Sequence, residues 1–376
     1  MKSNYLVYLN HYDIRPCTAQ YLWLYMLLLN KLPNSTFILN KDYVNPDRNR
    51  IEFTQLHRFP YIKEIPETLY PKNGVILDKV EDVIKDEIIP SRILNRVVNE
   101  VIPEYRDNLR KVIESNSLKG ALTWVNNKTL EEVFKEYNLP VIHNESGALR
   151  APFFNDTIYF DFKGVNGNTS FKERFEEFKK VSKQFPIYNR KELLQIVSPH
   201  KYKELIELSN KKPEYECGVA FQVDVDTNTM VYNKGMNSTD LLNLAVKTHH
   251  KVLVRNHPLS SIGYNSNISI GNCTLDTSKN SLEFISKCKN IWCINSSVGF
   301  EALMLGRNVK FFGDTPFKWI TYMNEEDKLL ALNFAVFNYL VPSQLVFNED
   351  YYDYRVKIKG NEEEIYYQFK KNHWLK

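Results

Sequence analysis

Short apolar runs alternate with amphipathic helical patterns along most of the 376-residue chain, and this alternation constrains the fold more than any other feature. The first series of predicted elements comprises strands at 5–9, 36–39, 74–77, 121–125 and 141–143, and helices at 18–32, 80–115 (with breaks at Pro90 and Pro103) and 130–137. A second series begins at Gly218, with strands at 218–225, 252–254, 291–294 and 309–312 and helices at 239–248, 281–287 and 297–305. Alternation of this kind is typical of a parallel sheet with helices on both faces. Because the length suits two domains better than one, we predict an α/β protein with two such domains.

The stretch between the two series sets the predicted domain boundaries. Residues 144–170 are rich in Gly, Asn and charged residues, and long loops of this kind in compact domains are usually functional. Helices are predicted at 171–185 and 191–208, and the second leads into the second series. We therefore predict an N-terminal domain at 1–190 that includes the 144–170 loop and a C-terminal domain at 191–350. The segment 351–376 is expected to return to the N-terminal domain as a helix.

The composition excludes several classes of protein. A content of 43% apolar and 25% charged residues is that of a globular chain. The net charge of +4, from 49 basic and 45 acidic residues, is too weak to indicate a nucleic-acid partner. Five cysteines without a CxxC spacing argue against a disulfide framework or a zinc site and fit a reducing cytoplasm. The longest apolar run, 21–29, is about half of what spans a bilayer.

The stretch N-S-S-V-G-F-E-A-L-M-L-G-R-N-V, residues 295–309, is the strongest local signal. An apolar strand precedes Ser296 and Ser297, an amphipathic helix follows them, and Gly306 stands at its C-terminal end. Free backbone N–H groups and the positive end of the helix dipole make such a turn suitable for a phosphate. The alternative is an ordinary helix cap, in which serine satisfies the first amides. Glu301 lies within the first turn or so of the same helix.

A second signal is V-L-V-R-N-H-P, residues 252–258, a strand that ends in Arg255 and His257. A basic strand end and a serine-to-helix turn commonly face the same phosphate in two-domain nucleotide-sugar enzymes. A lone histidine is usually a structural residue, but one that is followed by proline and preceded by arginine is harder to explain in that way.

Polar residues follow the predicted strand at 141–143. Glu145, after His143 and Asn144, is placed where ligands bind in doubly wound sheets and is a candidate general base, or else a solvated loop carboxylate. Arg150, in a Gly/Pro context, is suited to bind a carboxylate or phosphate in a bidentate manner. It is equally suited to pair with a nearby aspartate.

The stretch F-Q-V-D-V-D-T-N, residues 221–228, carries two carboxylates. Asp224 and Asp226 lie on one face if the preceding strand continues through them. They suggest either a metal site or one nucleophile with a structural partner. No third acid or histidine is clustered with them to complete a metal set.

Together these segments resemble the retaining β-Kdo glycosyltransferases of bacterial capsule and O-antigen assembly, above all glycosyltransferase family 99 (Kdo is 3-deoxy-D-manno-oct-2-ulosonic acid). The matching stretches, in family order, are T-W-V-N-N at 123–127, H-N-E-S-G-A-L-R-A-P-F-F at 143–154, F-D-F-K-G-V-N-G-N-T at 160–169, Q-V-D-V-D at 222–226, R-N-H-P at 255–258 and S-S-V-G-F-E-A-L at 296–303. Ser146-Gly147 stands where the family often has Leu-Gly, a departure that bears on the acceptor region.

The resemblance implies a GT-B-like fold, with two Rossmann-like domains and the active site in the cleft between them. It implies CMP-β-Kdo as the donor, held by the C-terminal domain, and no metal or other cofactor. It also implies that Asp226 is the nucleophile, with Asp224 one pleat away. Asp226 would displace CMP from the anomeric carbon, and an acceptor hydroxyl would then displace Asp226, so that two inversions give net retention.

The other residues receive roles on this basis. Ser296 and Ser297 are expected to hold the CMP phosphate, and His257 to bind or protonate it. Glu301 is expected to grip the ribose hydroxyls, and Glu145 to act as the acceptor base or to partner the adduct. The remaining candidates are Arg255 and Gln222 on the donor side and Arg150, Asn144 and Asp224 at the Kdo carboxylate or the acceptor.

Two other functions remain open at this point. One is another nucleotide-sugar transferase of GT-B type, such as a sialyl-type or UDP-sugar enzyme, and the other is a non-catalytic glycan-binding assembly subunit. The expected partners are a nucleotide-sugar donor, a glycan or glycolipid acceptor and other glycan-assembly enzymes, with no nucleic acid. We expect a cytoplasmic location, with peripheral contact at the inner face of the cytoplasmic membrane.

Overall fold

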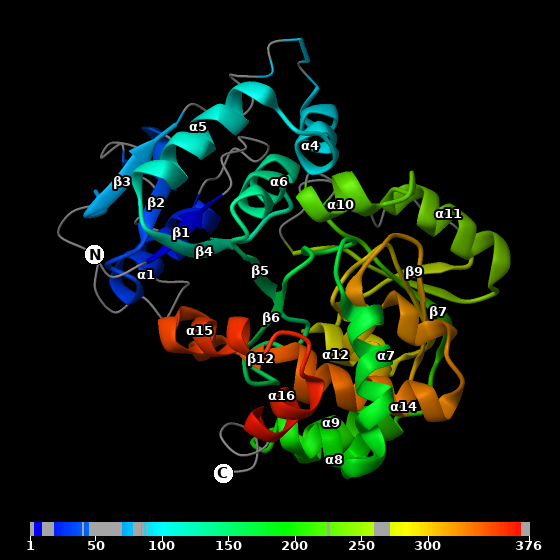
Figure 1. Ribbon diagram of the computed structural model, residues 1–376. Coiled ribbons are helices and arrows are strands. Elements are labelled where there is room, and N and C mark those ends of the chain that lie inside the picture. The colour runs from blue at the N-terminus through cyan, green and yellow to red at the C-terminus, as the bar shows by residue number, and fades with distance from the viewer. Residues whose placement is uncertain are drawn as a thin grey trace. The chain divides into compact units, whose positions relative to one another are not determined.

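The computed structural model describes residues 4–9, 19–39, 41–44, 70–77, 84, 86–87, 89–223, 226–258 and 271–369 (Figure 1). The chain divides into two compact units. Unit 1 comprises Met1–Glu145, Phe160–Val165 and Gln344–Lys357, and unit 2 comprises Ser146–Tyr159, Asn166–Ser343 and Ile358–Lys376.

The first sheet has seven strands in the order β12-β6-β5-β4-β1-β2-β3. Their bounds are β1 Asn4–Tyr8, β2 Thr36–Leu39, β3 Asn73–Ile76, β4 Leu118–Thr123, β5 Val141–Ser146, β6 Thr157–Asp161 and β12 Leu340–Pro342. The pairs from β5 through β4, β1 and β2 to β3 are parallel, whereas β12 pairs with β6 in the antiparallel sense. The predicted parallel α/β architecture is therefore confirmed for this part of the chain.

Two tyrosines of β1 contact helices on opposite faces of the sheet. The helices of unit 1 are α1 Ala19–Lys31, α4 Pro90–Asn99, α5 Pro103–Ser115, α6 Lys128–Glu136 and α15 Glu349–Lys357. The ring of Tyr8 meets Tyr105 of α5 edge to face. Tyr5, which points to the other face, meets Tyr352 of α15 and donates a hydrogen bond of 2.9 Å to Asp353. The chain thus returns to unit 1 through α15, whereas the residues from Ile358 onward belong to unit 2.

The predicted interruption of the 80–115 helical stretch at Pro103 is confirmed, because α4 ends at Asn99 and Pro103 begins α5. Pro90 likewise begins α4, since proline at the first helical position gives up an N–H that has no partner there. The prediction for residues 144–170 is wrong. The predicted 144–170 loop contains the end of β5 and the whole of β6. The apolar run in T-I-Y-F-D is a strand with every residue buried, and the glycines and asparagines around it obscured this pattern.

Unit 2 contains a parallel five-stranded sheet in the order β11-β10-β7-β8-β9. The strands are β7 Tyr215–Ala220, β8 Val252–Arg255, β9 Cys273–Leu275, β10 Cys288–Cys293 and β11 Asn308–Phe311. One face packs against α11 (Ser238–Thr248) through a core that includes Val219, Leu241 and Val254. On the other face, Gly218 leaves room for Phe284 of α12 (Ser281–Ser286), because an added Cβ would lie 2.8 Å from that ring. The second predicted Rossmann-like domain is thus confirmed, and with it the predicted GT-B-like fold class.

The other helices of unit 2 are α7 Phe171–Val181, α8 Arg190–Val197, α9 Tyr202–Asn210, α10 Thr227–Tyr232, α13 Val298–Met304, α14 Glu325–Phe334 and α16 Glu362–Phe369. Shorter helical turns are η1 Lys41–Val44, η3 Ser182–Gln184, η4 Pro316–Tyr322, η5 Ala335–Tyr339 (a π-helix) and η6 Ser343–Phe347. The predicted helix at 191–208 is two helices, because the chain turns at Ser198-Pro199. Within the described parts of the chain, no helix is long and apolar enough to span a bilayer.

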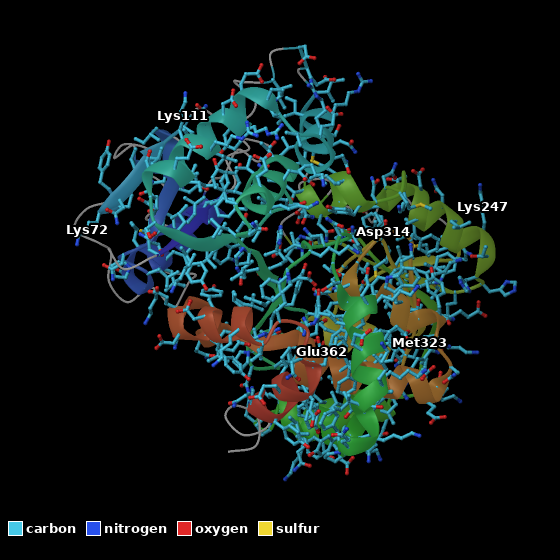
Figure 2. The ribbon with its side chains drawn as sticks, in the orientation of Figure 1. Lys72, Lys111, Lys247, Asp314, Met323 and Glu362 are labelled. Carbon is cyan, nitrogen blue, oxygen red and sulfur yellow. The ribbon has the colours of Figure 1, made fainter. Side chains whose placement is uncertain are left out.

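A buried ion pair attaches the last helix to unit 2. Glu362, labelled in Figure 2, begins α16 and receives two hydrogen bonds from Arg174 of α7, at 2.7 and 3.1 Å. The guanidinium also donates to the carbonyl of Asn338 at 2.9 Å, and the Asn338 amide donates back to the Glu362 carboxylate at 3.0 Å. The helices α7, η5 and α16 are therefore joined by one closed polar network.

Candidate functional site

Most of the predicted site residues lie in unit 2, where the carboxyl ends of three adjacent parallel strands meet. Strands β10, β7 and β8 are neighbours, so the segments after Cys293, after Ala220 and at Arg255 lie at the same edge of the sheet. The predicted site residues in unit 2 are Arg150, Gln222, Asp226, Arg255, His257, Ser296, Ser297 and Glu301. Asn144 and Glu145 lie in unit 1, and Asp224 lies outside the described residues.

A network of amides joins the segment after β7 to the turn after β10. The buried Gln222 side chain donates to Asn295 Oδ1 at 2.7 Å and accepts from the Asn295 backbone N–H at 2.8 Å. Asn295 in turn donates to the carbonyl and side-chain oxygens of Asn228, at 3.1 and 3.0 Å. Gln222 therefore contributes by fixing the turn that carries Ser296 and Ser297. Asn295 and Asn228 were missed as site residues, because only the fold reveals their partners.

The serine turn differs from an ordinary serine cap. Ser297 precedes α13 with helical backbone angles, and its side chain makes no capping hydrogen bond. Ser296 Oγ accepts a long hydrogen bond of 3.3 Å from the Val298 N–H. Gly299 allows α13 to pack closely on β11, since an added Cβ would collide with the Phe311 ring. Gly306 follows α13 with a φ of 74°, which agrees with its predicted place at the helix end.

Arg255, the last residue of β8, is anchored by a buried carboxylate. Its Nη1 donates to Asp276 Oδ2 at 2.7 Å and to the Ser278 carbonyl at 3.0 Å. The other oxygen of Asp276 accepts from the Ser278 hydroxyl at 2.6 Å and from its N–H at 3.1 Å. Burial opposes ionisation of Asp276, but these hydrogen bonds and the positive charge of Arg255 outweigh it and lower its pKa below the usual value. Asp276 is a site residue that no sequence motif indicated.

The charges of both predicted arginines act on Glu301 of α13. Burial raises the pKa of its carboxyl to about 7, opposed by a hydrogen bond with Ser281 and by the positive charges of Arg150 and Arg255. One carboxyl oxygen, Oε2, is buried with no hydrogen-bond partner. Arg150 Nε donates to the Gly147 carbonyl at 2.8 Å, and this bond holds the Nε side of the guanidinium group in place. In unit 2, two cationic side chains thus act electrostatically on a carboxyl that is only partly ionised at neutral pH.

This environment gives a prediction for stability as a function of pH. The pKa of Glu301 is about 7 in the folded protein and 4.5 in the unfolded chain. The contribution of the protonated carboxyl to the free energy of unfolding is therefore fully present below pH 4.5 and is lost as the pH rises through 7. Glu301→Gln does not titrate. Between about pH 5 and pH 8.5 its advantage over the wild type in the free energy of unfolding should grow, up to about 3 kcal/mol. Thermal melts across this range measure the difference. Glu214→Gln, at an exposed position, serves as the control, and parallel pH curves for all three proteins would contradict the prediction.

Asp226 is positioned by a helix start rather than by a strand. The strand β7 ends at Ala220, earlier than the predicted strand at 218–225, and Asp224 lies outside the described residues. Asp226 is the N-cap of α10, and its Oδ1 accepts from the Asn228 N–H at 3.3 Å.

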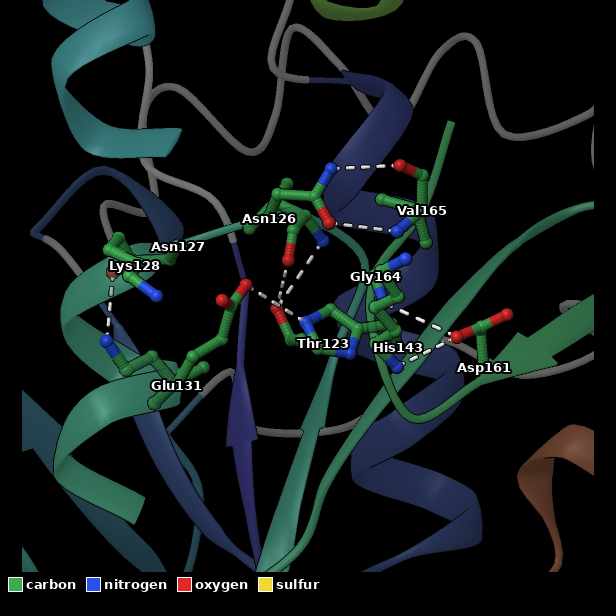
Figure 3. Close-up of polar contacts among 12 residues, drawn as sticks. Thr123, Asn126, Asn127, Lys128, Glu131, His143, Asp161, Gly164 and Val165 are labelled. Atoms are coloured by element: carbon green, nitrogen blue, oxygen red, sulfur yellow. Dashed lines mark hydrogen bonds and ion pairs between the residues drawn. The ribbon is translucent and has the colours of Figure 1, made fainter. Parts of the chain in front are cut away.

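In unit 1, the stretches that carry the family resemblance are joined by hydrogen bonds (Figure 3). Asn126 donates to the Val165 carbonyl and accepts from its N–H, both at 2.8 Å. Asn127 caps α6 and donates to the Tyr8 hydroxyl at 2.9 Å. The buried Asp161 accepts from the Lys163 N–H at 2.7 Å. These bonds shape the loop at 160–165 next to the end of β4.

The predicted H-N-E stretch ends β5 of the same unit. His143 is buried, with Nε2 at 3.4 Å from Glu131 Oε1. Asn144 is also buried, and its amide makes only long contacts with the carbonyls of Ile142 and Thr123, at 3.4 and 3.5 Å. Glu145 is half-buried at the strand end. Of the three, only Glu145 has the exposure that a base acting on an incoming hydroxyl needs.

Family models match both units. Residues 7–170 match the N-terminal domain of the glycosyltransferase 99 family, and residues 214–321 match capsule polysaccharide biosynthesis proteins. Over residues 7–170 the chain is therefore similar to glycosyltransferase family 99. The two matches support a glycosyltransferase, which takes a nucleotide-sugar donor and a glycan acceptor. No curated protein matches the chain.

Solved structures give more distant likenesses. The β-Kdo 2,7 transferase of Thermosulfurimonas dismutans KpsC is 14% identical, with 97% of this chain and 98% of that one covered at a TM-score of 0.45. The β-Kdo 2,4 transferase of the same protein is 15% identical, with coverages of 57% and 79% and a TM-score of 0.39. The UDP-GlcNAc 2-epimerase of Methanocaldococcus jannaschii is 12% identical, with coverages of 94% and 99% and a TM-score of 0.32.

Proposed function

We propose that this glycosyltransferase transfers β-Kdo from CMP-β-Kdo to a bacterial surface glycan, with retention of configuration. The match of residues 7–170 to the N-terminal domain of family 99 supports this proposal, because the motifs resemble the retaining β-Kdo transferases of that family. The observation that carries it is that the positive charges of Arg150 and Arg255 both act on Glu301 in unit 2. A CMP-Kdo donor carries two anions, the phosphate and the sugar carboxylate, and two guanidinium groups match them.

The proposed reaction has two displacements. A carboxylate oxygen of Asp226 attacks the anomeric carbon of Kdo, the bond from that carbon to the CMP phosphate oxygen breaks, and CMP leaves with the bonding electrons. An acceptor hydroxyl then attacks the same carbon, Glu145 takes the hydroxyl proton, and the bond to Asp226 breaks. Asp224, two residues before Asp226 in sequence, is the other candidate nucleophile.

The leaving group is proposed to bind at the serine turn. Ser296 and Ser297 donate to the CMP phosphate, and His257 binds or protonates it as it leaves. Glu301 accepts from the ribose hydroxyls, and Gln222 holds the turn through Asn295. Fixed donors of this kind take the place of a metal ion in stabilising the leaving charge. Among the described residues, no group of three or more His, Cys, Asp or Glu is placed to hold a metal; metal independence stays a proposal.

Nucleotide binding tests the donor. CMP at about 100 times its Kd is expected to raise the Tm by roughly 5 °C, and UDP is expected to have little effect. The purified protein should also hydrolyse CMP-β-Kdo, and the hydrolysis should persist in EDTA. A shift with UDP alone would identify a UDP-sugar enzyme instead. No shift and no hydrolysis would favour a non-catalytic glycan-binding subunit, and loss of activity in EDTA that Mn²⁺ restores would favour a metal site. We also propose that the transferase contacts the cytoplasmic membrane peripherally and works with other glycan-assembly enzymes.

A further inference from the structure

Asp276 is a fully buried carboxylate that lies directly after β9. Its backbone N–H donates to the Val254 carbonyl at 2.7 Å, which fixes the residue beside the end of β8. Oδ1 accepts the two hydrogen bonds from Ser278, and Oδ2 accepts from Arg255 at 2.7 Å. These hydrogen bonds therefore fix the orientation of the Asp276 carboxylate.

A second cation approaches the same carboxylate less closely. Lys287 Nζ lies 3.4 Å from Oδ1, and a quarter of the lysine side chain is exposed. Arg255 makes the shorter contact and is the less exposed of the two cations. A buried carboxylate that is left without its cation is strongly unfavourable, so the Arg255–Asp276 pair is the one that the fold fixes.

The pair uses only one edge of the Arg255 guanidinium. The hydrogen bonds of this group to Asp276 and to the Ser278 carbonyl both come from Nη1. Nε and Nη2 take no part in these bonds, and the charge of Arg255 also acts on Glu301 at the serine-turn side of the site. Arginine in general binds phosphate and carboxylate in a bidentate manner, with two N–H groups in a fixed plane.

We propose that Asp276 is a positioning residue of the nucleotide-sugar site, which holds Arg255 by Nη1 so that its remaining N–H groups meet the phosphate or carboxylate of the donor. This inference rests on the proposed function. Asp276 touches no substrate in this role and acts through Arg255. Its effect should therefore depend on the presence of both Arg255 and an anionic ligand group.

A double-mutant cycle with two ligands tests the proposal. The proteins are the wild type, Asp276→Asn, Arg255→Gln and the double variant, and the ligands are CMP and cytidine, with Kd measured by calorimetry. Asp276→Asn should weaken CMP binding about tenfold, the loss expected for one hydrogen bond to a charged group, and leave cytidine binding unchanged. In the double variant, CMP binding should be no weaker than in Arg255→Gln alone.

Two controls separate positioning from a merely structural role. Lys287→Met removes the other cation at Asp276 and should leave the affinity for CMP within about twofold of the wild type. Asp240→Asn, at an exposed position on α11, should change neither affinity. Equal weakening of CMP and cytidine by Asp276→Asn, or a further loss in the Arg255→Gln background, would overturn the proposal.

The cycle distinguishes this inference from the proposed donor. If the wild type binds UDP rather than CMP, the donor proposal fails, and the same cycle with UDP and uridine decides the role of Asp276. If the folded wild type binds neither nucleotide, both proposals fail. If CMP binds and Asp276→Asn binds it as tightly as the wild type does, only the positioning role is wrong.

Discussion

Asp226→Asn should abolish Kdo transfer while leaving the protein folded. Removing the nucleophile of a covalent mechanism typically lowers kcat by about 10³–10⁶-fold. Asparagine keeps an oxygen that can accept from the Asn228 N–H, as Asp226 does, and it is as good an N-cap as aspartate. The free energy of unfolding should therefore stay within about 0.5 kcal/mol of the wild type. Initial rates with CMP-β-Kdo and thermal melts give the two values.

The comparison with alanine separates the cap from the chemistry. Asp226→Ala should lose the same activity and, in addition, about 1 kcal/mol of stability, because it removes the N-cap of α10. Mass spectrometry of wild-type enzyme given donor without acceptor should show an adduct of the mass of Kdo on the peptide that contains Asp226. Normal turnover in Asp226→Asn, or an adduct on Asp224 instead, would show that Asp226 is not the nucleophile.

Glu362→Ala should destabilise the protein by about 3–5 kcal/mol, the usual cost of removing one partner of a buried ion pair. The variant takes the carboxylate partner away from the largely buried Arg174, and it removes an acceptor of the Asn338 amide. Since Glu362 begins α16, the loss should appear as release of that helix from α7 and η5. Urea unfolding and hydrogen exchange in 362–369 measure the two effects.

Two further substitutions make the Glu362 prediction specific. Glu362→Gln keeps the shape and hydrogen-bonding oxygen but loses the charge, so its cost should be smaller than that of alanine. Glu363→Ala, the next residue on the same helix turn, should cost less than about 1 kcal/mol. A Glu362→Ala variant as stable as Glu363→Ala would mean that the network does not hold α16.

Elements with a strong apolar period were predicted correctly from the sequence. The predictions match the structure within a residue or two for the parallel strands at 36–39 and 252–255 and for the helix at 238–248. In these elements, the spacing of apolar residues along a short segment indicates which side chains are buried. β6 was missed, since a fully buried strand between loops has no alternation to reveal it. α10 was missed because six residues are too few to show a helical period.

The candidate site was predicted in part. Gln222, Arg255, Ser296 and Glu301 were selected from short segments that each follow or adjoin a predicted strand, and the parallel order of β10, β7 and β8 places those strand ends together. Asp276, Asn295 and Asn228 were not selected, since a buried aspartate or asparagine looks like any turn residue until its partners are known. Asp224 lies outside the described residues, so its place relative to Asp226 stays a prediction.

The sequence by itself determined the α/β class, the two series of βα units, the family motifs and the positions of the charged residues among them. These are local properties, set by the spacing of apolar residues and by the chemistry of short segments. Only the tertiary structure decided which charges meet. Asp276 is ionised beside Arg255, and Glu301 is partly neutral at pH 7. The physical reason is that protonation depends on burial and on neighbours distant in sequence, such as Arg150, Arg255 and Ser281 around Glu301.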